Sequence, residues 1–420
     1  MTCRHPLRAA AGTVHVTYFV PQFPVLSQTY VLAHIVGLIE SGHEVHVVAQ
    51  QRGSEADAMH ADIARYALLG ERTTFLPAPP GGWFARLSRV RRLARGRWGM
   101  VRRAVSPLRY GSHGPSWRFA LTALNWPREL ATDVVLAHFG PAGNLAVQLR
   151  DVGAIAASVP IVTMFHGADI RRAQQRGPRI YRALIRRGDC VLAICRYNRE
   201  QLTAFGFDAA RIVDHAVGIV PAAFEVARTP ASDGTLRLLT VARLSDEKGI
   251  DVAIRALAQL PDRERIRWTI VGDGPQRGEL QQLAVSAGVA GQMHFVGALP
   301  ADAIPERLAA ADLFVLPSRA EITPVTLMEA GASSLASIAT RVGGVRDIVL
   351  DGRTGLLVPP DDAAALGDAI RTLAADPARR EALGAAAREH IVQHHNLARL
   401  NDTLANDILP AAIRQASRPA

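Results

Sequence analysis

Short apolar segments recur along the chain, and each is followed by a loop and by a stretch with helical patterning. In the first half these segments span residues 14–20, 44–49, 134–138, 161–165 and 190–194. In the second half they span residues 236–241, 268–271, 293–296, 313–316 and 335–339. Near-continuous apolar strands that alternate with helices are typical of parallel sheets covered by helices on both faces. The pattern therefore predicts an α/β fold with two doubly wound, Rossmann-like domains.

A polar segment with Pro, Ser, Asp and Gly at residues 227–235 is the best candidate for a linker between these domains. We therefore predict an N-terminal domain over residues 1–228 and a C-terminal domain over residues 236–395. A helical tail is expected at residues 396–420, crossing back to the N-terminal domain. Doubly wound sheets bind ligands at the carboxyl ends of their strands, so two such domains facing each other would form a central cleft.

The positive charge of the chain belongs to its first half. The 420 residues carry a formal net charge of +10, but residues 1–230 hold 28 basic and 15 acidic residues, against 20 and 23 in the remainder. Arginines and apolar residues alternate over residues 84–108, which predicts a basic amphipathic helix broken near Gly96 or Gly99. A second arginine cluster spans residues 171–187. Packed helices with a solvated face and a dock on an anionic membrane both fit, whereas no nucleic-acid-binding module is recognisable.

The composition excludes several other classes of protein. Three cysteines without metal-ligand spacing are too few for a disulfide framework, so a reduced, cytoplasmic chain is expected. Residues 9–39 carry no charge, yet polar residues and prolines interrupt them, which argues against a signal peptide or a spanning helix. Peripheral attachment to the inner face of the cytoplasmic membrane stays open.

Two cations stand out in the segment VARLSDEKGID at residues 241–251. Arg243 and Lys248 follow a predicted strand and precede a predicted helix, and Lys248 is the only lysine among 48 basic residues. Cations beside a helix N-terminus at the mouth of a parallel sheet suit a diphosphate, although a solvated loop is the usual explanation for two charges in isolation.

Two further segments of the second half carry candidate binding residues. In VGDGP, residues 271–275, Gly272 would let the backbone approach a ligand closely, although a plain tight turn fits about as well. In PSRAEITPVTLMEAG, residues 317–331, Glu321 precedes a helix that begins at Thr323 or Pro324, and Glu329 lies inside it. The helix start offers free N–H groups to a phosphate, and the carboxylates can accept hydrogen bonds from hydroxyl groups.

Taken together, these segments resemble the family-four retaining glycosyltransferases of the GT-B fold. The resemblance covers nearly the whole chain. It includes Glu321 and Glu329, which are separated by seven residues, and the segment at residues 339–360. In the first half, residues 19–31, 137–143 and 164–170 are similar to the exopolysaccharide and colanic-acid branch of that family.

The resemblance implies a role for each candidate residue. Arg243 and Lys248 would hold the diphosphate of the nucleotide-sugar donor, with Gly272, Pro324 and Val325 beside it. Glu321 would meet the transferred sugar and Glu329 the ribose. On the first domain, which would bind the acceptor, His166 would act at the reacting centre, where Asp169 or a backbone group would fix its tautomer. The remaining acceptor-side candidates are Ser27, Gln28, His138 and Asp169.

The expected function is therefore retaining transfer of a hexose to a saccharide acceptor, linked to a polyprenyl diphosphate, in exopolysaccharide, capsule or O-antigen synthesis. Neither a metal nor a cofactor is expected. The chain departs from the family pattern at three positions. Ile322 stands where a small residue is usual, Ser334 where Gly is usual, and Ala336 where Pro is usual. A degenerate, non-catalytic sugar-nucleotide-binding scaffold is the alternative, and a nucleotide-sugar epimerase of the same fold is a third hypothesis.

Overall fold

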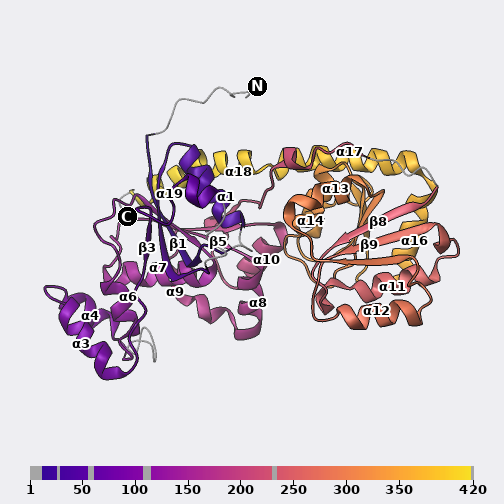
Figure 1. The fold of residues 1–420 in the computed structure, drawn as a ribbon. Helices are drawn as coiled ribbons and strands as arrows, with labels where there is room; N and C mark the ends of the chain where they lie inside the picture. The colour runs from indigo at the N-terminus through magenta and orange to yellow at the C-terminus, as the bar shows by residue number, and fades with distance from the viewer. Residues whose placement is uncertain (1–11, 26–28, 55–60, 107–114, 229–233, 418–420) are drawn as a thin grey trace. The chain divides into compact units, whose positions relative to one another are not determined.

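A computed structural model describes residues 12–25, 29–54, 61–106, 115–228 and 234–417 (Figure 1). The chain divides into two compact units. The first unit comprises Met1–Ile194, Arg199–His215 and Asn401–Ala420. The second comprises Cys195–Asn198 and Ala216–Leu400.

The first unit is built on a seven-stranded sheet in which every pairing is parallel. Its strand order is β3-β2-β1-β4-β5-β6-β7, so β1 lies between β2 and β4, and the order reverses beside it. The strands are β1 (His15–Phe23), β2 (Glu44–Arg52), β3 (Thr73–Phe75), β4 (Val134–His138), β5 (Ile161–Phe165), β6 (Cys190–Ala193) and β7 (Ile212–Asp214). Because β4 and β5 are buried along their whole length, they contain almost only apolar residues.

Helices connect these strands. They are α1 (Thr29–Glu40), α2 (Ala61–Arg65), α3 (Trp83–Leu93), α4 (Trp98–Ala104), α6 (Arg118–Leu124), α7 (Gly140–Val152), α8 (Gly167–Arg176), α9 (Arg182–Arg187) and α10 (Arg196–Ala204). The predicted basic amphipathic helix forms as the two helices α3 and α4, and the predicted break is confirmed because Gly96 between them has a φ of +73°. Both helices pack against α6.

The second unit has a six-stranded parallel sheet with the order β10-β9-β8-β11-β12-β13. Its strands are β8 (Leu236–Val241), β9 (Ile266–Val271), β10 (Met293–Gly297), β11 (Leu313–Leu316), β12 (Ser337–Thr340) and β13 (Gly355–Val358). Its helices are α11 (Ile250–Gln259), α12 (Arg277–Ser286), α13 (Ile304–Ala309), α14 (Val325–Ala332), α15 (Val345–Ile348), α16 (Ala363–Ala375) and α17 (Pro377–His394).

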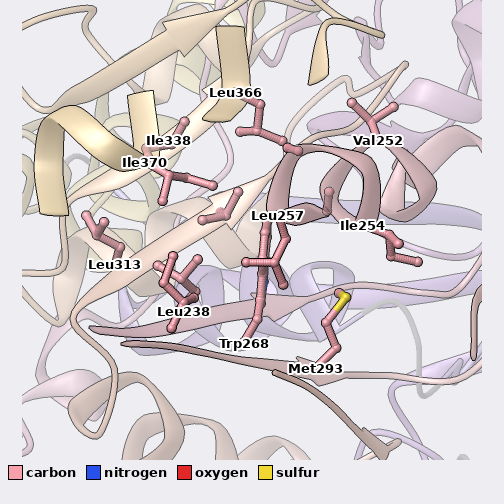
Figure 2. Close-up of a cluster of buried hydrophobic side chains, with 14 of the residues drawn as sticks. Leu238, Val252, Ile254, Leu257, Trp268, Met293, Leu313, Ile338, Leu366 and Ile370 are labelled. Atoms are coloured by element: carbon pink, nitrogen blue, oxygen red, sulfur yellow. The ribbon is translucent and has the colours of Figure 1, made fainter. Parts of the chain in front are cut away.

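Separate apolar clusters cover the two faces of this second sheet. On one face, side chains of α11, α12 and α16 pack around Trp268, Leu257 and Ile370 (Figure 2). On the other face, side chains of α13 and α14 pack against Phe314 and Leu316 of β11. Figure 1 shows α11 and α12 on one side of β8 and β9, with α13 and α14 on the other. This two-sided cover is the reason that the strands contain near-continuous apolar runs.

The border between the units differs from the sequence-based one. Residues 216–228 belong to the second unit, because Ile219 forms a parallel bridge with Asn396 and joins the apolar cluster that contains Phe314. The chain ends in α18 (Leu397–Thr403), a π-helical turn (Leu404–Ile408) and α19 (Leu409–Ala416). Within the first unit, the Asn401 side chain donates to the Ala33 carbonyl oxygen of α1 at 3.2 Å. None of the described helices is both long enough and apolar enough to span a membrane.

Candidate functional site

The loops at the carboxyl ends of β8 and β11 bring Lys248 and Glu321 together. The Lys248 Nζ atom lies 2.6 Å from Glu321 Oε1, and the buried Ser318 hydroxyl donates to the same oxygen at 2.8 Å. Both side chains of the ion pair are mostly buried, with 19% of Lys248 and 9% of Glu321 exposed. The ammonium retains N–H donors beyond the one that Glu321 accepts, so it can bind an anionic ligand without releasing the carboxylate.

An arginine that the sequence reasoning missed fastens these two loops to each other. Arg319 donates to both carboxylate oxygens of Asp251, at 2.9 and 2.7 Å, and its backbone N–H donates to the Glu247 carbonyl oxygen at 2.8 Å. Burial alone would raise the pKa of Asp251, but hydrogen bonds and charge from Arg319 outweigh it and hold the pKa below its usual value. A lone arginine in a loop gives no signal in sequence, since its partner lies 68 residues away.

Two glycines allow close backbone packing beneath the site. A Cβ on Gly272, at a φ of +135°, would overlap the Ala242 carbonyl oxygen. A Cβ on Gly343, at a φ of +47°, would overlap the Glu321 carbonyl oxygen. Gly272 is therefore placed to seat the loop that carries Arg243, and Gly343 seats the loop that carries Glu321.

Helix α14 places Glu329 one turn inside its N-terminus. Pro324 is the N-cap residue and Val325 the first helical residue, close to the predicted start. The Glu329 carboxylate has no described hydrogen-bond or ion-pair partner, and burial raises its pKa to about 7. A carboxyl group held without a partner near the helix start is available to hydrogen-bond a ligand hydroxyl group.

The exposed Arg243 also lacks a described acidic partner. The neighbouring Leu244 is fully buried, and the backbone N–H of Leu244 donates to the Asp273 carbonyl oxygen at 2.9 Å. The loop is therefore anchored at Leu244, while the Arg243 guanidinium has no described acidic partner. The structure thus gathers one pair directly, Lys248 with Glu321, and holds Arg243 and Glu329 on neighbouring elements of the same unit.

The structure shows the surroundings of the residues in and after α14 where the chain departs from the family pattern, and of Ile322. Ser334 follows α14 with a φ of +55°, a left-handed conformation in which glycine is favoured, so this turn carries strain. Gly331 inside α14 is needed because a Cβ there would lie 2.7 Å from the Ile391 side chain of α17. The backbone of Ala336 is part of the sheet, since its carbonyl oxygen accepts from the Phe314 N–H at 3.0 Å. The Ile322 carbonyl oxygen accepts from Cys195 Sγ at 3.4 Å.

The first unit collects histidines at the carboxyl ends of its strands. His138 ends β4, and His166 directly follows β5 as the N-cap residue of α8. His166 Nε2 lies 3.1 Å from His138 Nδ1, and His34 Nδ1 of α1 lies 3.3 Å from His138 Nε2. His215, just after β7, has its ring centroid 5.7 Å from that of His34. All four side chains are buried, and sequence reasoning did not single out His34 or His215.

Burial keeps this histidine cluster neutral. It lowers the pKa of His166 to about 3 and that of His215 to about 4, and the pKa values of His34 and His138 lie well below the usual value. Asp169 accepts the backbone N–H of His166 at 2.9 Å, and burial raises the pKa of Asp169 to about 6.

The predicted roles in the first unit are thereby altered in two respects. The ring contact that can fix the His166 tautomer comes from His138, whereas the contact of Asp169 is with the His166 backbone. His138 itself is 0% exposed, so its side chain is not open to a ligand in this structure. Ser27 and Gln28 lie outside the described residues. Among the residues that the structure describes, no group of three or more His, Cys, Asp or Glu side chains could hold a metal ion.

Two basic surfaces lie elsewhere on the first unit. Helices α3 and α4 expose Trp83, Phe84 and Trp98 by 47%, 81% and 51%. The arginines beside them whose side chains have no described hydrogen-bond or ion-pair partner are Arg89, Arg91, Arg92, Arg95 and Arg102. We call these eight residues the α3–α4 surface. Within the 171–187 cluster, a hollow of about 450 Å³ is lined by Pro178, Arg179, Arg182, Ile185, Arg186 and Phe205.

Comparisons with known proteins show the family of the chain. Residues 27–214 match the model of Glycosyltransferase Family 4, and residues 223–390 match that of Glycosyl transferases group 1. The chain is 32% identical over 406 residues to the putative colanic acid biosynthesis glycosyltransferase WcaL of Salmonella typhimurium, covering 93% of this chain and 98% of that protein. It is 32% identical over 368 residues to the amylovoran biosynthesis glycosyltransferase AmsK of Erwinia amylovora, covering 83% and 88%.

Solved structures show the same fold. Anabaena HepE in complex with UDP superposes with a TM-score of 0.69 at 17% identity, over 94% of this chain and 99% of that one. The sucrose-phosphate synthase of Thermosynechococcus elongatus gives 0.67 at 21% identity, over 96% and 100%. With two parallel sheets of the doubly wound type, paired family matches and near-full-length relatives, the chain belongs to the family-four glycosyltransferases of the GT-B fold and is a nucleotide-sugar-dependent glycosyltransferase.

Proposed function

We propose that this enzyme transfers a hexose, with retention of anomeric configuration, from a nucleotide sugar to a lipid-linked saccharide in exopolysaccharide synthesis. The names of two relatives, which concern colanic acid and amylovoran, support the polysaccharide context. The observation that carries the proposal is the Lys248–Glu321 pair at 2.6 Å, on a unit where Arg243 and Glu329 have no described partner. That set offers two cations for a diphosphate and two carboxylates for sugar hydroxyl groups.

On the donor side, charge stabilisation is the main task. As the bond between sugar and phosphate breaks, negative charge grows on the departing diphosphate, and cations fixed beforehand stabilise it without reorganising. Arg243 and Lys248 would supply this charge, with no metal or cofactor needed. Glu321, held by Lys248 and Ser318, would orient the hydroxyl groups of the transferred sugar. Glu329 would accept a hydrogen bond from the ribose.

On the acceptor side, His166 would supply a neutral hydrogen-bonding group. With its pKa near 3 it does not carry a charge at neutral pH, so it would hydrogen-bond to a sugar hydroxyl group rather than compete for the diphosphate. For retention, the acceptor oxygen would attack from the face that the diphosphate leaves, and an oxygen of the leaving phosphate would take the proton. No protein carboxylate is then needed as a base.

The α3–α4 surface would bring the enzyme to its lipid-linked acceptor at the inner face of the cytoplasmic membrane. Exposed Trp and Phe side chains beside arginines that have no described acidic partner are the pattern by which an interfacial helix binds anionic lipid. Vesicles of phosphatidylglycerol should therefore bind the protein in a salt-sensitive manner. Because each basic residue contributes about 1 kcal/mol near such a surface, the Arg91→Gln/Arg92→Gln variant should bind about 30-fold more weakly.

The matched control removes two exposed arginines of the second unit, as Arg371→Gln/Arg379→Gln. It should bind the vesicles as the unchanged protein does. Equal binding to phosphatidylcholine vesicles, or equal loss in both double variants, would show that the α3–α4 surface is not the membrane contact.

The donor proposal is tested by thermal shift with UDP, GDP, ADP and their sugars, since a ligand that binds the folded state raises its stability in proportion to its affinity. One nucleotide series should stabilise the enzyme. A charge-assisted hydrogen bond contributes about 1.5–3 kcal/mol, so Lys248→Ala should weaken nucleoside-diphosphate binding by about 10- to 100-fold. Arg371→Ala, which removes an exposed cation of α16, should leave binding unchanged.

Turnover then distinguishes the candidate functions. Release of nucleoside diphosphate that depends on an added lipid-linked saccharide supports sugar transfer. Tight binding with neither transfer nor hydrolysis would favour the non-catalytic scaffold, and product sugars formed without an acceptor would favour an epimerase.

A further inference from the structure

Three histidine rings of the first unit form one continuous chain of nitrogen contacts. His34 Nδ1 lies 3.3 Å from His138 Nε2, and His138 Nδ1 lies 3.1 Å from His166 Nε2. Both ring nitrogens of His138 are thereby engaged by other histidines. The sequence separations are 104 and 28 residues, so the packing of α1 on the ends of β4 and β5 creates the chain.

Aromatic packing holds the rings in their orientations. Tyr18 of β1 stacks on His138 with ring centroids 5.1 Å apart and an interplanar angle of 24°. Tyr30 of α1 packs on His166 at 4.7 Å, and Phe139 packs on the same ring at 5.0 Å. This packing restrains rotation of the His138 and His166 rings, which would change which of their nitrogens meet.

Because burial keeps all three rings neutral, each carries one N–H and one bare nitrogen. Each of the two contacts must join a donor to an acceptor, which leaves only two arrangements for the whole chain. In the first, His34 donates to His138 and His138 donates to His166, so His166 carries its hydrogen on Nδ1. In the second, every donor and acceptor is reversed, and His166 carries its hydrogen on Nε2.

The His34 end of this histidine chain decides between the two arrangements. His34 Nε2 is buried and has no hydrogen-bond partner among the described residues. In the second arrangement this nitrogen would carry a hydrogen with no acceptor, and an orphaned buried N–H is rarer and costlier than an unfilled acceptor. The neighbouring ring is His215, and neither of its nitrogens has a partner within the described chain. The first arrangement leaves only a bare nitrogen there.

We propose that His34 and His138 are positioning residues that hold His166 in the tautomer with its hydrogen on Nδ1. His166 then presents a hydrogen-bond donor, at the one ring nitrogen that the histidine chain does not use. The catalytic meaning of this donor rests on the proposed function, in which it would bind a sugar oxygen. The tautomer itself rests on the contacts of the three rings, on their neutrality and on the unpartnered His34 Nε2.

The direct test is NMR of the full-length protein labelled with ¹⁵N-histidine, because the nitrogen shifts of an imidazole report which nitrogen carries the hydrogen. In the unchanged protein, His166 should show a protonated Nδ1 and a bare Nε2, and His138 should show the same pattern. A His166 spectrum with a protonated Nε2, or with both nitrogens averaged by rapid exchange, would overturn the proposal without any variant.

Two substitutions of His34 separate the hydrogen bond from packing. His34→Leu keeps apolar volume but removes the donor, so the His166 tautomers should mix. His34→Asn places an amide N–H where Nδ1 was, so the single tautomer should return. An unchanged His166 spectrum in His34→Leu would show that His34 does not set the tautomer.

Kinetics add a second readout with the same pair of variants. The wrong tautomer in a catalytic histidine lowers turnover by as much as about 10,000-fold, so His34→Leu, which mixes the tautomers, should lower kcat by at least about 10-fold with little change in KM. His34→Asn should recover most of that loss. If the unchanged enzyme transfers no sugar from any donor, the proposed function fails, whereas the nitrogen shifts still decide whether the histidine chain acts as stated.

Discussion

The first unit gathers four neutral imidazole rings in its interior, whereas the second unit gathers ions on partly exposed loops. His138 and His34 have almost no contact with solvent, while Arg243 is exposed and Lys248 remains partly so. A diphosphate needs fixed positive charge, and a sugar hydroxyl group needs directed but uncharged hydrogen bonds. The contrast is that fixed charge lies on loops of the second unit, whereas neutral hydrogen-bonding groups lie inside the first.

The contrast predicts that the buried histidines of the first unit and Glu329 of the second respond to pH in opposite directions. In the first unit, burial lowers the histidine pKa values, so between pH 6.5 and about 4 the unfolded chain binds protons that the folded unit does not. The contribution of the neutral histidines to the stability of the first unit is complete above pH 6.5, and it decreases as the pH falls below 6.5. In the second unit, the pKa of Glu329 is raised to about 7, so from pH 4.5 to 7 the folded state holds a proton that the unfolded chain has released. That contribution is lost as the pH rises.

Acid should produce the largest effect. Each neutral buried histidine costs about 1.4 kcal/mol per pH unit below 6.5, so the first unit should lose several kcal/mol between pH 7.5 and 5.5. Asp169, with a pKa of about 6, offsets one of the four histidines over part of this range. Hydrogen-exchange protection of β4 and β5 should therefore fall far more than that of β11 and β12.

A variant makes this comparison sharper. His215→Phe replaces a ring whose nitrogens have no described partner, so the pH slope of the first unit should decrease by about 1.4 kcal/mol per pH unit. Equal loss of protection in both units, or an unchanged slope in His215→Phe, would contradict the view that the neutral histidines cause the acid sensitivity.

The next effect tests the backbone beneath the ionic site. Gly343→Ala places a Cβ against the Glu321 carbonyl oxygen, and together with the strain of positive φ it should cost about 3 kcal/mol of unfolding free energy. Gly352→Ala is a matched control, because its φ is +73° but no atom lies within 4 Å of the added Cβ. It should cost only about 1 kcal/mol. Urea unfolding measures both.

Nucleotide affinity should separate the same two variants. Gly343→Ala displaces the loop that holds Glu321 against Lys248, so binding of the nucleoside diphosphate should weaken, whereas Gly352→Ala should bind normally. If both variants bind and unfold alike, close packing at residue 343 does not position the site.

Glu329→Gln should produce the smallest effect. The wild-type protein should lose about 2 kcal/mol of stability relative to this variant between pH 5 and pH 8, since only the glutamate must ionise while buried. Urea unfolding at both pH values, followed through a probe in the second unit, measures the difference. Parallel pH profiles for the two proteins would mean that Glu329 ionises in the folded state as easily as in water.

Some of this organisation was already determined by the sequence. The alternation of apolar strands with helices predicted two parallel sheets, because strands buried on both faces must be apolar along their length. The break at Gly96 and the start of α14 near Pro324 were predictable, since glycine and proline act on the local backbone alone.

Only the tertiary structure decided which residues meet. Lys248 lies 73 residues from Glu321, Arg319 lies 68 from Asp251, and His34 lies 104 from His138. Spacing along the chain gives no signal for such pairs, because the sheet topology brings them together. Only the family resemblance assigned Lys248 and Glu321 to one donor site. Burial likewise decides that His166 is neutral and that Glu329 titrates near pH 7, because the surrounding packing sets the desolvation of each group.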